Sequence, residues 1–159
     1  MEPRLVTSKE RKLVGKRITM SLANNKTGEL WKSFMPTRGQ ITNKVSSDLI
    51  SMSVYGPAHF VDFKPSKEFE KWAALEVAGF ENVSDGLETF ILPGGLYAVF
   101  DYKGSSTDTR IFQYIFGEWL PNSRFELDSR PHFEILGEKY KNNDPDSEEE
   151  IYIPVKQRF

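Results

Sequence analysis

The order of predicted structural elements repeats along this chain, and the repeat restricts the folds that the chain can adopt. Two segments, 27–35 and 106–120, carry bulky apolar residues at helical spacing. Each is followed at once by proline, in the sequences FMPTR and WLPNS. Proline removes a backbone donor and clashes with the preceding turn, so both helices are expected to end there. An alternating run precedes each helix and two follow it, which gives the order strand, helix, strand, strand twice.

Alternating apolar residues and the turn signals between them predict the strands. The predicted strands are 12–23, 49–56, 69–80, 87–92, 96–102, 132–137 and 149–155. Segment 69–80 fits a helix or a strand, and its place after 49–56 favours a strand. Pro93-Gly94-Gly95 predicts a turn between its flanking strands. We interpret residues 1–10 as a polar lead-in and 57–69 as a long hairpin connection. Ser106 or Thr107 is expected to cap the second helix.

The element order predicts an α+β domain with two β-α-β-β halves, about residues 10–80 and 87–157. Its sheet is expected to be antiparallel, with the helices on one side. A chain of 159 residues fits one domain, 1–159. When the strands are aligned on their closing glycines, VYG lies over ILG. This alignment places Ser53 at the position of Glu134.

Composition excludes several classes of protein. The chain has no cysteine, which excludes disulfides, thiolate metal sites and cysteine nucleophiles. Its net charge is −2 with both signs scattered, which argues against direct nucleic-acid binding. The N-terminal sequence MEPRLVTSKERKLVGKR lacks the apolar core of a secretory signal. No stretch approaches the roughly 18 apolar residues of a membrane span. We therefore expect a cytoplasmic protein without membrane contact.

Metal and cofactor sites are not expected either. His59 and His132 are the only histidines, and no carboxylate stands at metal-ligand spacing from either. The acidic run DPDSEEE lacks the glycine and the distal glutamate of a calcium loop, so it is interpreted as a solvated hairpin tip. No dinucleotide or P-loop fingerprint is present.

Glu134 is the residue that raises a functional question. In the sequence RPHFEILG, Phe133 and Ile135 face one side of the predicted strand, and His132 and Glu134 face the other. If that side is exposed to water, Glu134 is an ordinary surface residue. If it lines a pocket, burial would raise the pKa of this carboxyl, and a bound cation would favour its ionised form.

Four segments resemble a known family: GGLYAVFDYKG, IFGEWLPNSRFEL, RPHFEILGEKY and EEEIYIPVK. Together they resemble the GyrI-like small-molecule-binding domain, also called the AraC-type effector-binding domain. The likeness is firm over 87–157 and weaker over 10–80. It implies the duplicated β-α-β-β fold and an aromatic-walled ligand cavity between the halves. It also implies that Glu134 is the deep acidic residue that faces lipophilic cations in drug-sensing members. The residues before position 11 are too few for a helix-turn-helix, so a freestanding copy is expected.

The candidate ligand-binding residues combine this carboxylate with aromatic side chains. They are Glu134, Trp31, Phe34, Tyr97, Phe116, Trp119 and Tyr152. Aromatic faces attract cations and stack on flat ligands. Trp31, Phe34, Phe116 and Trp119 stand at helical spacing, so packing in a plain hydrophobic core is the alternative reading for each of them.

These observations favour a binding module over an enzyme: a freestanding sensor or sequestration protein for a small lipophilic or cationic compound. One alternative is a hydrolase of strained electrophilic natural products, with Glu134 as general base. Another is a protein inhibitor of a DNA-processing enzyme, for which the acidic loop 140–150 would be a contact surface. The expected partners are a small ligand and possible protein partners, with the chain as a monomer or homodimer.

Overall fold

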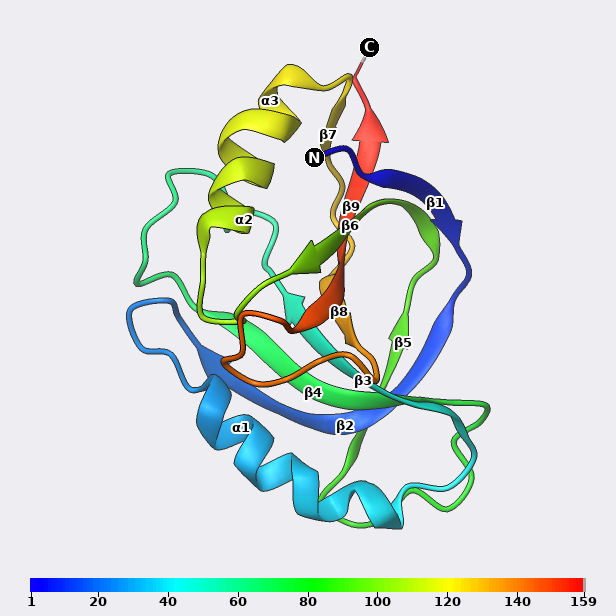
Figure 1. Cartoon of the computed structure of the whole chain (residues 1–159). Coiled ribbons are helices and arrows are strands. Elements are labelled where there is room, and N and C mark those ends of the chain that lie inside the picture. The colour runs from blue at the N-terminus through cyan, green and yellow to red at the C-terminus, as the bar shows by residue number, and fades with distance from the viewer. Residues whose placement is uncertain (159) are drawn as a thin grey trace.

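The computed structural model describes residues 1–158, which form a single antiparallel sheet with helices packed on its outer face (Figure 1). The strands are β1 (Arg4–Ser8), β2 (Arg11–Met20), β3 (Lys44–Val54), β4 (Phe69–Val77), β5 (Glu88–Leu92), β6 (Gly95–Lys103), β7 (Phe125–Leu127), β8 (His132–Leu136) and β9 (Glu148–Gln157). The helices are α1 (Thr27–Phe34), the 3₁₀ turn η1 (Met35–Gln40), α2 (Arg110–Tyr114), the π turn η2 (Ile115–Trp119) and α3 (Leu120–Asn122). The predicted α+β class is confirmed.

The two ends of the sheet are joined to each other. The strand order is β1-β6-β9-β8-β3-β4-β2-β5, with β7 beside β9. β1 continues into β2, and β5 continues into β6. The β1–β6 pair and the β2–β5 pair share one register, which runs from Arg4 opposite Val99 to Gly15 opposite Glu88. The lead-in predicted for residues 1–10 is therefore wrong, because Arg4–Ser8 is a strand that pairs with β6. None of its residues is buried, so its alternation is weak.

The two halves meet in the middle of the sheet, where β3 pairs with β8. Ser51 lies opposite Glu134, Met52 opposite Phe133, and Ser53 opposite His132. The glycine alignment superposes Ser53 on Glu134 and Ser51 on His132. It therefore maps the cross-strand pair Ser51–Glu134 onto the cross-strand pair His132–Ser53. A local twofold axis thus passes between Met52 and Phe133 and relates the halves.

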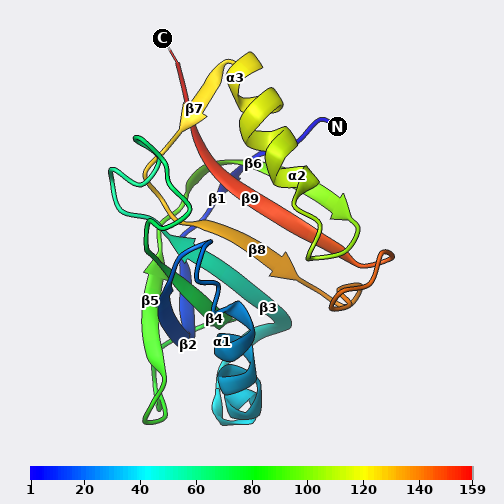
Figure 2. The same cartoon turned by 90° about the vertical axis from the view of Figure 1, so that its left-hand side faces the viewer.

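Three hydrophobic clusters hold the layers together. The first lies inside the closed sheet and includes Leu13, Met52, Trp72, Tyr97 and Phe133. The second lies under α2, and the third lies under α1. Figure 2 shows α1 and α2 at opposite ends of the outer face, with β3 and β8 between them. The strip of sheet between the helices is therefore not covered by either of them.

The second helix differs from its prediction at its start. It begins at Arg110, not near Ser106, and Thr109 is the N-cap residue. Ser105 and Thr107 pair their hydroxyl groups at 2.8 Å, while Asp108 Oδ1 accepts from the Arg110 amide at 3.0 Å. The hydroxyls are thus used in the turn before the helix. The first helix ends at Phe34, and Pro36 lies in the 3₁₀ turn that follows.

Candidate functional site

The uncovered part of the outer face carries a set of polar side chains that we call the central strip. It consists of Ser51 and Ser53 on β3, Lys71 on β4, His132 and Glu134 on β8, and Glu149 on β9. Cross-strand pairing puts these side chains on one face, because Lys71 pairs with Ser53 and Glu134 pairs with Ile151, two residues from Glu149. Lys71 Nζ donates to Ser53 Oγ at 3.3 Å. All six residues lie within strands and are buried or half-buried, so the sheet fixes their positions.

Glu149 is the most unusual member of the central strip. Its side chain is only 9% exposed, and its Oε2 atom has no hydrogen-bond partner among the described residues. Burial, and then the negative charge of Glu134, raise the pKa of Glu149 to about 9. Two ionised carboxylates can only accept hydrogen bonds, whereas a proton on one of them supplies the missing donor. The pair is therefore expected to hold one proton at neutral pH.

An aromatic cover lies over one end of the central strip: Tyr55, His59, Phe60 and Phe63 from the connection between β3 and β4, with Phe116 from η2. The ring of Phe60 stacks on His132 at 5.6 Å and on Phe116 at 6.1 Å. The Lys67 ammonium donates to the carbonyl oxygens of Ala58 and Val61 and so holds the connection in shape. The cover thereby bridges the first half of the chain to the second helix.

Burial favours the neutral form of His132 in the central strip and of His59 in the aromatic cover at neutral pH. Burial, followed by the charges of His59 and Lys71, lowers the pKa of His132 to about 3. Burial also lowers the pKa of His59, with Lys67 contributing. Neutral imidazoles add ring area to the cover without adding positive charge. The site therefore combines carboxyl groups with flat apolar surface, a combination that suits an organic cation.

The structure brings together only some of the predicted site residues. Glu134 is half-buried on the central strip, and Phe116 stacks at 6.0 Å on the neighbouring His132. Phe34 is fully buried in the cluster under α1, and Trp31 packs edge-on against it at 5.8 Å. Their role in ligand binding stays a prediction.

Tyr97 and Tyr152 lie on the opposite face of the sheet from Glu134. Both belong to the cluster inside the closed sheet, where Tyr152 stacks on Phe133 at 4.4 Å. Tyr97 Oη donates to the carbonyl oxygen of Pro93 at 3.1 Å. Because side chains alternate along a strand, these rings face inward while Glu134 faces outward.

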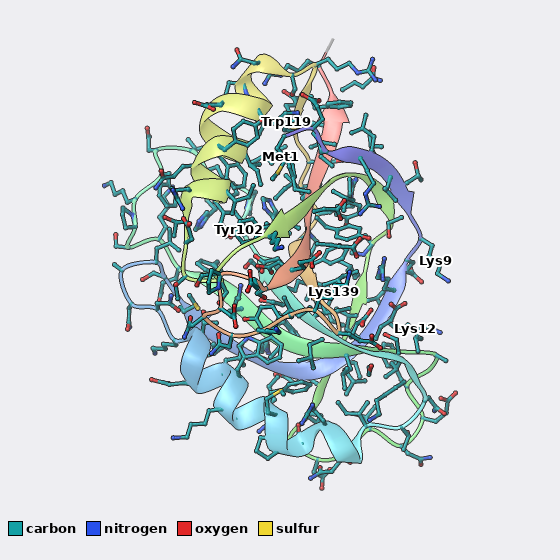
Figure 3. The ribbon with its side chains drawn as sticks, viewed as in Figure 1. Met1, Lys9, Lys12, Tyr102, Trp119 and Lys139 are labelled. Carbon is teal, nitrogen blue, oxygen red and sulfur yellow. The ribbon has the colours of Figure 1, made fainter. Side chains whose placement is uncertain are left out.

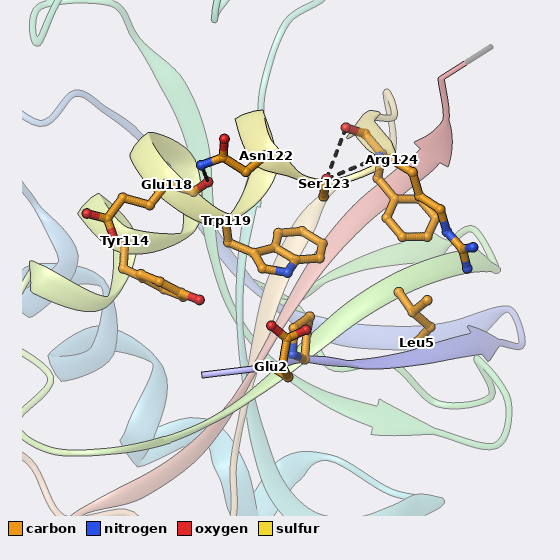
Figure 4. Close-up of a pocket in the computed structure, with 10 residues that line it drawn as sticks. Glu2, Leu5, Tyr114, Glu118, Trp119, Asn122, Ser123 and Arg124 are labelled. Carbon is orange, nitrogen blue, oxygen red and sulfur yellow. Dashed lines mark hydrogen bonds between the residues drawn. The ribbon is translucent and has the colours of Figure 1, made fainter.

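Trp119 lines a different feature, a cavity of about 610 Å³ between the N-terminal residues and the α2–α3 segment. Figure 3 shows Trp119 beside Met1, away from Lys12. Figure 4 shows the cavity, with Glu2 and Leu5 facing Tyr114, Trp119 and Arg124 across it. None of the ten residues that line it is a buried ionisable group. The buried ionisable groups thus belong to the central strip and not to this cavity.

Sequence reasoning missed Glu149, Lys71 and the aromatic cover. A signal for Glu149 was present, because it shares strand parity with Ile151, Ile153 and Val155, which are buried. The acidic run around it was interpreted as a solvated tip, which is wrong for this residue. No local signal placed Phe60 against Phe116, because that contact joins distant parts of the chain.

Two further searches of the described residues gave negative results. Within residues 1–158, no group of three or more His, Asp or Glu side chains could hold a metal ion. No helix in that range is long and apolar enough to cross a membrane.

Comparison with protein families gives a match over nearly the whole chain. The matching model is described as "Cass2: Integron-associated effector binding protein" and covers residues 4–155. The transcriptional regulator BrlR of Pseudomonas aeruginosa is 27% identical over 157 residues, which are 98% of this chain and 56% of BrlR. The chain thus spans about half the length of this curated relative.

Solved structures with the same fold include SAV2435 and the C-terminal domain of EcmrR. SAV2435 bound to tetraphenylphosphonium has a TM-score of 0.70 at 15% identity, over 98% of this chain and 94% of that chain. The EcmrR C-terminal domain has a TM-score of 0.70 at 13% identity, over 99% of this chain and 98% of that chain. At these identities the likeness establishes the shared fold.

Proposed function

Because this chain belongs to the Cass2 family of integron-associated effector binding proteins, we propose that it binds a small lipophilic cation on the central strip. It would act as a sensor or as a sequestration module for that compound. The observation that carries this proposal is the carboxyl pair of Glu134 and Glu149, held in the sheet between two helix-covered surfaces.

The physical basis is the poor solvation of the pair. A buried carboxylate lacks water to stabilise its charge, and a bound cation supplies the missing counter-charge. Rings of the aromatic cover would add cation–π attraction of roughly 0.5–2 kcal/mol each. Tyr55, Phe60 and Phe116 are the candidates closest to the strip, because all three rings pack against His132. Such a site would select ligands by their positive charge and flat apolar surface more than by one hydrogen-bond pattern.

Two relatives support this choice of ligand and role. Tetraphenylphosphonium, which is bound to SAV2435, is a lipophilic cation. BrlR is a transcriptional regulator, so the region related to this chain is part of a regulatory protein. At 15% identity, the similarity to SAV2435 establishes the shared fold alone. The ligand class is our proposal for this chain.

Isothermal titration calorimetry with tetraphenylphosphonium tests the proposal. We expect saturable binding to the wild type and at least about tenfold weaker binding to Glu134→Gln, which keeps the shape but removes the charge. The matched control is Glu138→Gln, because Glu138 is exposed just after β8 and should not contribute. Equal affinity for wild type and Glu134→Gln would refute the role of the carboxylate.

The same ligand panel separates binding from catalysis. Mass spectrometry of the compounds after incubation is expected to show protection in proportion to the protein, without turnover. Loss of compound over many cycles would favour the hydrolase alternative, in which Glu134 acts as a general base. Inhibition of a DNA-processing enzyme by the purified chain would instead support the protein-inhibitor alternative.

A further inference from the structure

We infer that a cation enters the central strip in exchange for one proton, which Glu134 and Glu149 hold between them in the free protein. This inference rests on the proposed function and adds the ligand class. Binding of a singly charged organic cation releases one proton, whereas binding of a neutral molecule of the same shape releases none. The protein would therefore couple effector binding to pH.

The position of Glu149 is the first support. Its side chain is buried to nine-tenths, and Oε2 lacks any donor among the described residues. Glu134 lies on the adjacent strand and on the same face, close enough for their carboxyl groups to form a hydrogen bond once one is protonated. A proton thus satisfies an atom that the rest of the structure leaves without a partner.

The charges around the pair are the second support. The titratable groups around it on neighbouring elements are Lys71 on β4, Tyr55 after β3, His132 on β8 and Tyr102 on β6. His59 of the β3–β4 connection lies beside Tyr55. Burial lowers the pKa of both histidines and raises that of both tyrosines, so all four are neutral near pH 7. Among these groups, Lys71 alone carries positive charge.

The exchange follows from charge balance. With one proton on the carboxyl pair, its single negative charge is matched by Lys71. A cation that arrived without loss of the proton would leave one excess positive charge in a poorly solvated site. When Glu149 releases its proton to solvent, the bound cation and Lys71 face two carboxylates, and the balance is restored. One singly charged ligand therefore releases one proton, and a neutral ligand releases none.

A measurement without ligand tests the premise. The infrared spectrum of the free protein in D₂O at neutral pH should contain a carbonyl stretch of a protonated carboxylic acid. That band should disappear in Glu149→Gln and in Glu134→Gln, because the carboxyl group that remains is then ionised. It should be unchanged in Glu138→Gln. A wild-type spectrum without any such band would overturn the inference, whether or not a ligand binds.

Calorimetry tests the exchange itself. Methyltriphenylphosphonium and its neutral counterpart triphenylphosphine oxide are titrated in phosphate and in Tris, which differ in ionisation enthalpy. For wild type, the cation should release about one proton and bind about tenfold more tightly for each unit of pH between about 6 and 8. The neutral compound should show neither effect. In Glu149→Gln the cation should release no proton, and its affinity should be flat with pH.

The outcomes separate the two proposals. If the cation binds wild type without proton release, or if Glu149→Gln retains the pH dependence, the exchange is refuted and the binding function stands. If neither compound binds and the acid band is present, the proton is confirmed and the proposed ligand class is refuted. Circular dichroism of each variant verifies that it is folded.

Discussion

Glu134 and Glu149 lie on the same outer face of the sheet on adjacent strands, β8 and β9, and the negative charge of Glu134 raises the pKa of Glu149. Pairing of Glu134 with Ile151 sets this arrangement, because it places Glu149 diagonally across on the same face. Two acidic groups in one half-buried position lower the stability of the fold unless a proton or a cation is present.

Glu149→Gln is expected to change the pH dependence of stability. The folded-state pKa of Glu149 is raised from 4.5 to about 9, so its contribution is favourable below the unfolded value and is lost as pH rises towards 9. The variant should be about 1–3 kcal/mol more stable than wild type near pH 8 and no more stable near pH 4. Urea unfolding at several pH values measures this, with the exposed Glu138→Gln as control. A constant difference across the range would contradict the prediction.

His132→Phe is expected to act in the opposite pH range. Burial lowers the pKa of His132 from 6.5 to about 3, so the neutral ring stabilises the fold above pH 6.5, and that contribution is lost as pH falls. Phenylalanine keeps the stacking with Phe60 and Phe116 but cannot be protonated. The variant should lose less stability than wild type between about pH 6.5 and 4, as measured by thermal unfolding. Parallel stability curves would argue against a buried neutral imidazole.

Gly15→Ala should destabilise the sheet strongly. A Cβ atom at Gly15 would lie 2.0 Å from the Ala73 carbonyl oxygen and 2.7 Å from Ala74 Cα, which is backbone that cannot move aside. We expect a loss of about 3 kcal/mol or more in the free energy of unfolding. Gly28→Ala is the matched control, because nothing lies within 4 Å of its Cβ and the helix should gain up to about 1 kcal/mol. Equal stability of both variants would show that β2 and β4 are less tightly packed than described.

Phe60→Ala is expected to open one end of the central strip. The mutation removes the ring that stacks on His132 and Phe116. Stopped-flow fluorescence should show faster association of tetraphenylphosphonium, with a stability loss of about 0.5–1.5 kcal/mol. Val61→Ala is the control, because Val61 is 63% exposed and should change neither quantity. Unchanged or slower association would show that the Phe60 ring does not obstruct entry to the central strip.

Tyr97→Phe should leave cation affinity unchanged, although Tyr97 was a candidate site residue on sequence grounds. Its ring lies inside the closed sheet, and its hydroxyl donates to Pro93. Loss of that hydrogen bond should lower stability by about 0.5–1.5 kcal/mol. Calorimetry and urea unfolding on the same sample distinguish these effects. A clear loss of affinity would place the ligand on the inner face of the sheet.

Much of the fold was predictable, because it depends on local signals. Pro36 follows the end of α1 at Phe34, and the alternation in β8 and β9 was clear. The end predicted at Pro121 was wrong, because Pro121 lies within α3 and the helical segment continues to Asn122. The likeness to the GyrI-like domain is confirmed by the family match and the shared fold. β1 was missed because its alternation is weak, and its role is to pair with a distant strand, β6.

The candidate site was less predictable than the fold. The face of β8 that carries Glu134 followed from alternation, but its partner Glu149 stood in an acidic run typical of an exposed loop. Aromatic content could not distinguish rings of the inner cluster, such as Tyr97, from rings of the cover, such as Phe60. That distinction depends on which sheet face each strand presents, and register between distant strands decides it.

The local twofold axis between Met52 and Phe133 relates two halves whose chemistry has diverged. At corresponding points on its two sides stand the hydroxyl of Ser53 and the carboxyl of Glu134. A molecule lying across the axis would therefore be seated with a fixed polarity: its onium head towards β8 and its uncharged tail towards β3. A linker for immobilisation or a fluorophore should be tolerated when attached to the tail and should abolish binding when attached beside the head.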